Sequence, residues 1–260
     1  MGEKVDFMKF FAIALFDRLR RVVKLVVHAG KFFVAGKIEK PDYLIVDDVG
    51  VAYLVMPKAA CTSIKRSMVV AAEGEEVANN VEKRRAAIAR LMIRGKVKGL
   101  EDKYVFTYVR NPFARLVSAY INKFEDMEKI KRSGFLYDEY LGGYLKLSDS
   151  FEEFVRKIAK IPDRVCDRHF MSQSYLVDHL APHKPQDIFK LEEINESYPS
   201  LVERFGFSSL EFANRSASYD YRDYYKNKDI LDLVFNRYRE DVERFGYQSD
   251  YQAIKEYMAN

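Results

Sequence analysis

Apolar and polar residues follow two different rhythms along this chain. Short apolar runs rich in β-branched and aromatic residues predict strands at residues 43–46, 51–56, 104–109 and 187–191, the first two joined as a hairpin. Apolar residues three or four apart predict helices at residues 64–72, 81–93, 112–124, 151–160, 194–205 and 229–245. We expect polar loops at residues 125–149 and 161–186. Strands that alternate with helices are typical of an α/β domain, so we expect a parallel sheet flanked by helices.

The first forty residues form a separate segment in this pattern. Their apolar residues recur every three or four positions and line one face of a helix: Phe7, Phe11, Leu15, Leu19, Val22 and Val26. The uncharged run at residues 10–16 is far shorter than the roughly 20 residues that cross a bilayer. We therefore predict a basic amphipathic arm at 1–40 and one domain at 41–260. Two interpretations of the arm stay open: a helix packed on protein, or a helix lying on an anionic membrane.

Composition and charge narrow the class of protein. The chain has 260 residues, of which 48% are hydrophobic, and this excludes a mainly disordered protein. Two cysteines exclude a disulfide framework, and with no secretory signal they favour the cytoplasm, including the inner membrane face. The net charge of +4 lies in the arm, which has nine basic and four acidic residues, so the remainder carries −1. The body thus lacks the basic excess of a nucleic-acid-binding protein, and we expect no nucleic-acid partner.

A first candidate anion site lies where the second strand passes through a tight turn into a helix, at residues 55–65. The N-terminus of a helix presents unpaired backbone N–H groups and a positive dipole end. Lys58 adds a cation, Thr62 and Ser63 add hydroxyl donors, and the small residues 59–61 allow close approach. The glycines of the Walker pattern are absent, so the turn lacks the signature of a nucleoside triphosphatase.

A second candidate site follows the strand at residues 104–109. Arg110 stands at the carboxyl end of that strand, where α/β proteins bind ligands. Pro112 suits the first turn of the next helix, and the Ser118 hydroxyl within this helix could share an anion with Arg110. Arg115 is expected at the surface or in an ion pair.

Together the two turns resemble the donor-binding motifs of sulfotransferases that use 3′-phosphoadenosine 5′-phosphosulfate. Residues 57–66 and 109–124 are similar to those motifs in the carbohydrate sulfotransferases of the chondroitin 4-O, dermatan and HNK-1 group (sulfotransferase family 2). Residues 238–247 resemble that family's C-terminal helix and its closing Phe-Gly-Tyr. The resemblance spans roughly residues 43–247. It implies the P-loop-like sulfotransferase fold, 3′-phosphoadenosine 5′-phosphosulfate as donor, and no metal.

The resemblance also implies roles for single residues. The first turn would bind the 5′-phosphosulfate, with Lys58 stabilising the leaving phosphate oxygen. Arg110 and Ser118 would bind the 3′-phosphate, and a later loop would add further contacts. The expected donor-binding residues are Lys58, Ala59, Ala60, Cys61, Thr62, Ser63, Ile64, Arg110, Ser118, Asn214, Arg215 and Ser216.

A general base is also needed, because the acceptor hydroxyl must lose a proton. His169 is the first candidate, since residues 167–175 resemble the family's His-Trp-x-x-Gln segment, with Phe170 in place of the tryptophan. A purely structural histidine is the alternative, and the other candidate bases are Glu125, Asp126 and Glu128. The spacing of Cys166, His169, His179 and His183 is superficially like a zinc site, although Pro182 interrupts the second pair.

These patterns predict an enzyme that transfers a sulfuryl group by in-line displacement to a hydroxyl, with a carbohydrate or glycolipid as acceptor. A P-loop-like nucleotide kinase is the first alternative, and the missing Walker glycines count against it. The second alternative is a non-catalytic module that docks on a membrane or a protein partner. The arm alone would suit such a module, but the two anion-binding turns would then have no role.

Overall fold

The computed structural model describes residues 15–16, 18–20, 22–23, 26–27, 29–30, 39–95, 99–125, 143–210 and 219–259. The chain divides into two compact units, Met1–Ile38 with Tyr120–Cys166, and Glu39–Ala119 with Asp167–Asn260. The second unit contains the sheet and both candidate turns. The division into an arm and a single domain stays a prediction.

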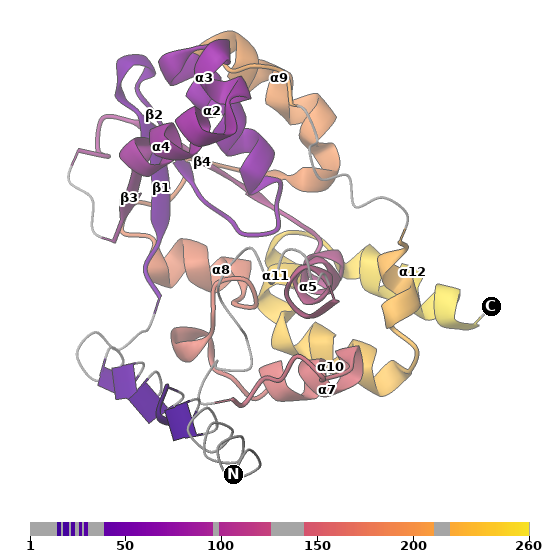
Figure 1. The fold of residues 1–260 in the computed structure, drawn as a ribbon. Coiled ribbons are helices and arrows are strands. Elements are labelled where there is room, and N and C mark those ends of the chain that lie inside the picture. Colours follow the sequence, from indigo (N-terminus) through magenta and orange to yellow (C-terminus); the bar gives the residue numbers. More distant parts are fainter. Residues whose placement is uncertain are drawn as a thin grey trace. The chain divides into compact units, whose positions relative to one another are not determined.

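The second unit is built on a five-stranded mixed sheet in the order β3-β1-β2-β4-β5 (Figure 1). The strands are β1 (Asp42–Val46), β2 (Val51–Leu54), β3 (Met92–Arg94), β4 (Tyr104–Val109) and β5 (Asp187–Lys190). The predicted parallel arrangement holds for β2, β4 and β5, whereas β1 runs antiparallel to both β2 and β3. The predicted hairpin between β1 and β2 is confirmed, and Gly50 closes it at φ +66°, where glycine has no steric cost.

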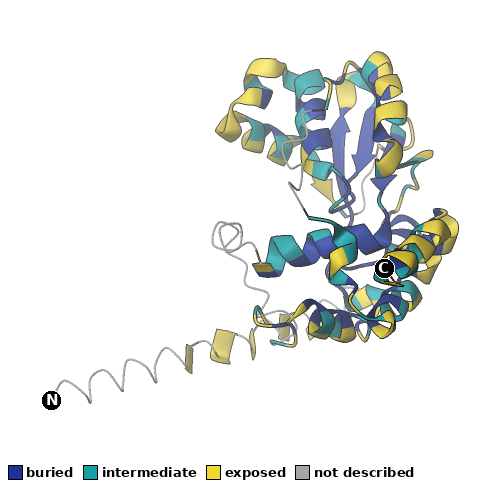
Figure 2. Ribbon diagram, turned by 90° about the vertical axis from the view of Figure 1, so that its right-hand side faces the viewer, coloured by how far each residue is buried: buried dark blue, intermediate teal, exposed yellow. Residues whose placement is uncertain are grey.

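Helices cover the sheet so completely that every residue of β1 and β2 is buried (Figure 2). These helices are α2 (Cys61–Glu73), α3 (Glu75–Asn79), α4 (Val81–Leu91) and α9 (Ile194–Phe205). Val69, Ala78 and Ala87 pack α2, α3 and α4 against one another. Strands buried on both faces read as continuous apolar runs, which is why the sequence pattern located them.

The C-terminal part of the second unit departs from the sequence prediction. The single helix expected at 229–245 is wrong, because Tyr238 leaves the helical conformation and separates α10 (Lys228–Arg237) from α11 (Arg239–Arg244). The hydroxyl of Tyr238 donates to the backbone oxygen of Phe170, so a tertiary contact outweighs local helix propensity. A further helix, α12 (Gln248–Ala259), was not predicted.

The polar loop expected at 161–186 is also wrong in part. Its middle is helical, first as α8 (Gln173–Tyr175) and then as a wider turn at Leu176–Leu180. Leu176, Val177 and Leu180 are buried there, and their burial stabilises helical turns that the flanking prolines conceal in the sequence. By contrast, α5 (Pro112–Tyr120) begins where it was predicted and passes into a wider turn at Ile121–Glu125.

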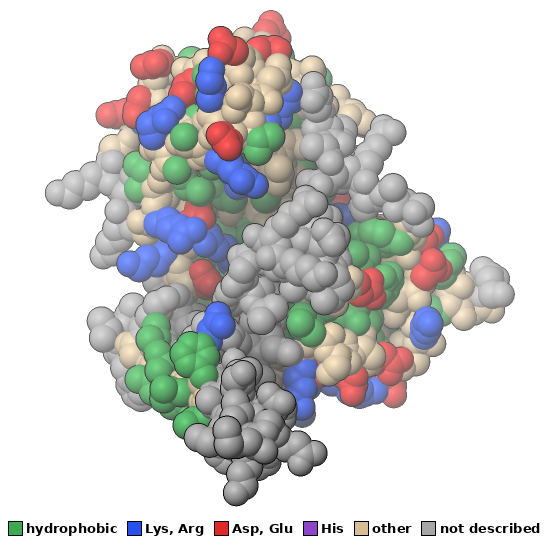
Figure 3. Space-filling model, in the orientation of Figure 1, with side chains coloured by type: hydrophobic (Ala, Val, Ile, Leu, Met, Phe, Trp, Pro, Cys, Tyr) green, Lys and Arg blue, Asp and Glu red, His purple; other side chains and the backbone are tan. Residues whose placement is uncertain are grey.

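The first unit contains α7 (Phe151–Ile158), which begins with a capping box between Ser150 and Glu153. Its core is aromatic: the rings of Tyr120 and Phe124 lie 5.4 and 4.9 Å from that of Phe154. The arm's described large apolar side chains are exposed (Figure 3): Leu15, Phe16, Leu19, Val22, Val23, Val26 and Val27. No helix among the described residues has the length and hydropathy needed to cross a bilayer.

Candidate active site

The first candidate turn connects β2 to α2 through an unusual backbone. Lys58 and Ala60 have φ values of +70° and +53°, a left-handed conformation that costs energy for any residue with a Cβ atom. Ala60 immediately precedes α2 and has no side-chain acceptor to cap the helix. The first N–H groups of α2 therefore lack the side-chain cap that many helices have, and suit an anion.

The residues of this turn differ in what they offer a ligand. Thr62 is exposed, and Lys58, Ala60 and Cys61 are half-buried. Ala59, Ser63 and Ile64 are buried. The Ile64 N–H already donates to the Ala60 oxygen at 3.1 Å, so this residue serves mainly to pack α2 into the core. The amides available to an anion are those at positions 61–63.

Arg110 lies directly beyond β4 and joins the second turn to the first. Its backbone N–H donates to Oε1 of Gln173 at 2.9 Å, and its backbone oxygen accepts from Nε2 of Gln173 at 2.8 Å. Its guanidinium Nη1 donates to the backbone oxygen of Lys58 at 3.2 Å. Because β2 and β4 are adjacent and parallel, both turns lie at the same edge of the sheet.

The helix after Arg110 is fixed at its start by Asn111. The Oδ1 atom of Asn111 accepts from the amides of Phe113 and Ala114, and its Nδ2 donates to Asp250 at 2.7 Å. Burial and the nearby charge of Glu192 raise the pKa of Asp250. Ser118 lies two turns further along, on the same helical face as Asn111, and it is half-buried among buried neighbours.

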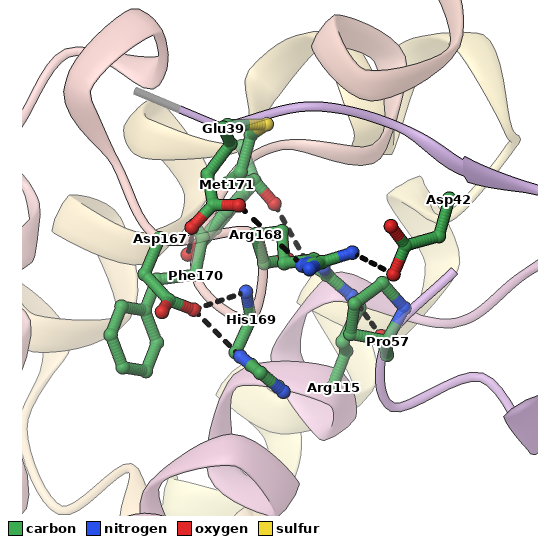
Figure 4. Close-up of polar contacts among 10 residues, drawn as sticks. Glu39, Asp42, Pro57, Arg115, Asp167, Arg168, His169, Phe170 and Met171 are labelled. Carbon is green, nitrogen blue, oxygen red and sulfur yellow. Dashed lines mark hydrogen bonds and ion pairs between the residues drawn. The ribbon is translucent and has the colours of Figure 1, made fainter. Parts of the chain in front are cut away.

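Arg115 is buried, so the expected position at the surface is wrong. It is 2% exposed, and its guanidinium donates to three backbone oxygens (Figure 4). The acceptors are Pro57 at 3.0 Å, Met171 at 2.8 Å and Arg168 at 2.9 Å. One side chain thus connects the residue before Lys58 to the loop that contains His169. A charge within the otherwise apolar run at 113–120 is the sequence signal that could have revealed it.

The His169 loop places an imidazole beside a carboxylate. The Nδ1 atom of His169 and its backbone N–H both contact Oδ1 of Asp167, while the side chain is 28% exposed. The preceding residue, Arg168, forms ion pairs with Asp42 and Glu39 (Figure 4). Burial acts to lower the pKa of Arg168, but these two carboxylates outweigh it and raise the pKa. The loop is therefore held on both sides of the histidine.

The other residues expected from the sequence lie elsewhere. Asn214, Arg215 and Ser216 fall outside the described residues, as do Asp126 and Glu128. Glu125 belongs to the first unit. Of the histidines with zinc-like spacing, His179 packs on Tyr175, and His183 lies 3.8 Å from Glu101. In the described ranges no group of three His, Cys, Asp or Glu side chains is arranged to hold a metal ion.

Comparison with known proteins identifies the family of the chain. Residues 41–248 match the model of the sulfotransferase family. The chain belongs to the sulfotransferase family. The match includes β2, β4 and both turns, so the resemblance and the α/β fold predicted from the sequence are confirmed.

Two curated members of this family are similar to the chain over most of its length. Carbohydrate sulfotransferase 12 of Xenopus laevis is 26% identical over 257 residues, and that of Mus musculus is 27% identical over 255 residues. Each alignment covers 79% of this chain and 60% of the relative, so the chain spans less than two thirds of these sulfotransferases. No solved structure matches the chain.

Proposed function

We propose that this protein transfers a sulfuryl group from 3′-phosphoadenosine 5′-phosphosulfate to a hydroxyl group of a carbohydrate or glycolipid. The hydrogen bond between Arg110 and the Lys58 backbone carries the proposal, because it joins two anion-binding turns at one sheet edge. The donor carries two separate phosphate groups, so binding both of them requires two such turns side by side. The names of the similar proteins support a carbohydrate acceptor.

The donor would be held by the turn residues in two places. The amides at positions 61–63, with the Thr62 and Ser63 hydroxyls, would bind the 5′-phosphosulfate. Arg110 and Ser118 would bind the 3′-phosphate. The left-handed backbone at Lys58 and Ala60 supports this arrangement, since strained backbone commonly persists where a ligand needs it.

Transfer would follow an in-line path. The acceptor oxygen forms a bond to sulfur while the bond between sulfur and the phosphate oxygen breaks, and the acceptor proton passes to Nε2 of His169. Lys58 would neutralise the negative charge that develops on the leaving phosphate oxygen. A carboxylate at Nδ1 would favour the tautomer whose Nε2 carries the lone pair, and Asp167 is placed to do this.

Calorimetry without metal tests the donor site. Wild-type protein should bind 3′-phosphoadenosine 5′-phosphate with a dissociation constant on the order of micromolar, and ATP far more weakly. Arg110→Ala should weaken binding about 10- to 100-fold through loss of charged hydrogen bonds. Arg90→Ala is the matched control, because Arg90 is exposed and pairs with Glu73, outside both turns. Equal affinity for ATP would favour the kinase alternative instead.

Labelled donor tests the acceptor class. Transfer of labelled sulfate to polysaccharides, glycolipids and simple alcohols should be greatest with a sugar hydroxyl. Label that enters only the simple alcohols would rule out the carbohydrate part of the proposal.

The arm would attach the enzyme to an anionic membrane surface. Its exposed apolar residues and its positive charge are the two features that such helices combine. Sedimentation with phosphatidylglycerol vesicles should fall sharply when residues 1–30 are deleted. Unchanged sedimentation would leave the protein-packing interpretation of the arm.

A further inference from the structure

The carboxylate of Asp241 is buried, lies outside both turns and contacts the segment that pairs with Arg110. Asp241 is in α11, it is 0% exposed, and both its oxygens accept hydrogen bonds. Oδ2 accepts the Gln173 N–H at 2.8 Å, and Oδ1 accepts the N–H and the hydroxyl of Ser174 at 2.7 Å each. A buried carboxylate is costly unless it is fully hydrogen-bonded, and here it caps α8 from another helix.

Gln173 is also 0% exposed. Its side-chain amide hydrogen-bonds to Arg110 and is not placed to contact a ligand. Its amide group makes both hydrogen bonds that a neighbouring strand would make to the Arg110 backbone. A side chain thus extends the pairing of β4 by one residue, to the position where the Arg110 guanidinium leaves the sheet. The side-chain amide can do this only in one orientation, and Nε2 of Gln173 also donates to Oδ2 of Asp241 at 3.4 Å in that orientation.

Two more residues of the same C-terminal segment contact site loops. The Tyr238 hydroxyl donates to Phe170, next to His169, and the Tyr247 hydroxyl donates to Oε2 of Glu192 at 2.8 Å. The other oxygen of Glu192 accepts the backbone N–H of Asn111 at 2.9 Å. Residues 238–247 therefore contact the segment at 170–174 and, through Glu192, the backbone of Asn111.

We propose that Asp241 is a positioning residue for donor binding, acting through Gln173 on the backbone of Arg110. It touches neither donor nor acceptor. This inference rests on the proposed function, since it assumes that Arg110 binds the 3′-phosphate. It predicts that the affinity for the 3′-phosphate depends on a carboxylate 68 residues beyond Gln173 in the chain.

Calorimetry with two nucleotides separates positioning from general stability. Asp241→Asn keeps the shape of the side chain but places an N–H₂ group against hydrogen-bond donors. This variant should bind 3′-phosphoadenosine 5′-phosphate about tenfold more weakly than wild type. Adenosine 5′-phosphate, which lacks the 3′-phosphate, should bind Asp241→Asn and wild type equally. In the Arg110→Ala background, Asp241→Asn should change affinity less than about twofold, because coupled residues are not additive.

Two further variants complete the experiment. Gln173→Met removes both contacts with Arg110 at similar volume and should reproduce the loss of affinity even where Asp241→Asn folds poorly. Asp178→Asn is the matched control: Asp178 pairs with Arg244 and so joins α11 to the turn at Leu176–Leu180, which follows α8. It should bind both nucleotides as wild type does.

The outcomes are distinct. Unchanged affinity for 3′-phosphoadenosine 5′-phosphate in Gln173→Met or in well-folded Asp241→Asn overturns the inference, as does an equal loss for both nucleotides. Wild-type protein that fails to bind 3′-phosphoadenosine 5′-phosphate refutes the proposed function itself, and the inference with it.

Discussion

The imidazole of His169 is oriented by Asp167, whose Oδ1 lies 2.6 Å from Nδ1 and 2.8 Å from the backbone nitrogen of the same histidine. One carboxylate oxygen thus fixes both the ring and the chain that carries it. A carboxylate that accepts from Nδ1 favours the tautomer with the proton on Nδ1 and the lone pair on Nε2. Side chains paired in this way are typical of general bases in enzymes.

His169→Ala should therefore lower turnover about 10²- to 10⁴-fold while leaving the dissociation constant of 3′-phosphoadenosine 5′-phosphate unchanged. Asp167→Asn should lower turnover less, because the ring stays present but loses its fixed tautomer. His179→Ala, on the exposed side of the neighbouring turn, should keep full turnover. Initial rates at saturating donor distinguish these variants, and a His169→Ala enzyme with near wild-type rates would exclude this base.

Arg115→Met should lower the free energy of unfolding by about 3 kcal/mol or more. The substitution leaves three backbone oxygens without their donor, and each buried group left unsatisfied costs about 1–3 kcal/mol. Arg115→Lys should recover only part of this loss, because an ammonium group cannot span the same three acceptors. Urea denaturation measures the effect, with Arg90→Met expected within about 0.5 kcal/mol of wild type. A similar result for the two methionine variants would contradict the role of Arg115.

Ala60→Val should destabilise the protein by at least about 1 kcal/mol, because a β-branched side chain is poorly tolerated at positive φ. Ala60→Gly should be tolerated, since glycine adopts this conformation freely. Ala72→Val, inside α2, is the control and should cost no more than about 0.7 kcal/mol. Thermal unfolding and donor calorimetry on the three variants check this, and equal losses at positions 60 and 72 would argue against backbone strain.

Asp241 should give the protein a characteristic pH dependence of stability. Burial raises the pKa of this carboxyl above its ordinary value of 3.8, although the hydrogen bonds from Gln173 and Ser174 oppose the shift. Between pH 3.8 and the raised value, the folded protein binds more protons than the unfolded chain, so the free energy of unfolding falls as the pH rises. Asp241→Asn should flatten this part of the curve.

Urea denaturation over a series of pH values that extends below 3.8 gives the measurement. The half-buried Asp220 provides a comparison of opposite sign, because its hydrogen bond from Arg222 lowers the pKa of Asp220. Its contribution to the free energy of unfolding is present above the unfolded pKa and is lost as the pH falls through the folded pKa. This contribution should be small, because water screens a pair that is partly exposed. An unchanged slope in Asp241→Asn would show that this carboxyl does not titrate differently on folding.

Four of the five strands and the two turns were accessible to sequence reasoning because their signals are local, whereas β3 begins within the helix predicted at 81–93. The run at 104–109 is apolar and β-rich throughout, and the predicted bounds agree with β4. The turn after β2 was recognised from consecutive residues, and the helix at 194–205 was predicted with its full extent. In each case the information lies within one window of the sequence.

The parts that were missed depend on contacts between distant residues. Nothing near Gln173 in the sequence indicates that its amide pairs with Arg110, or that a carboxylate from α11 orients it. The break at Tyr238 has the same origin, because the ring hydroxyl bonds to a different segment. Arg115 could have been recognised from its apolar neighbours, but its three acceptors could not.

The three acceptors of Arg115 also bear on how the protein moves. Local opening in proteins occurs in cooperative units whose members lose protection together. Since one guanidinium holds Pro57, Arg168 and Met171, a fluctuation that releases one of these carbonyls withdraws support from all three. The first candidate turn and the loop that contains His169 would therefore open and close in concert, and amide hydrogen exchange in both segments should proceed at a common rate.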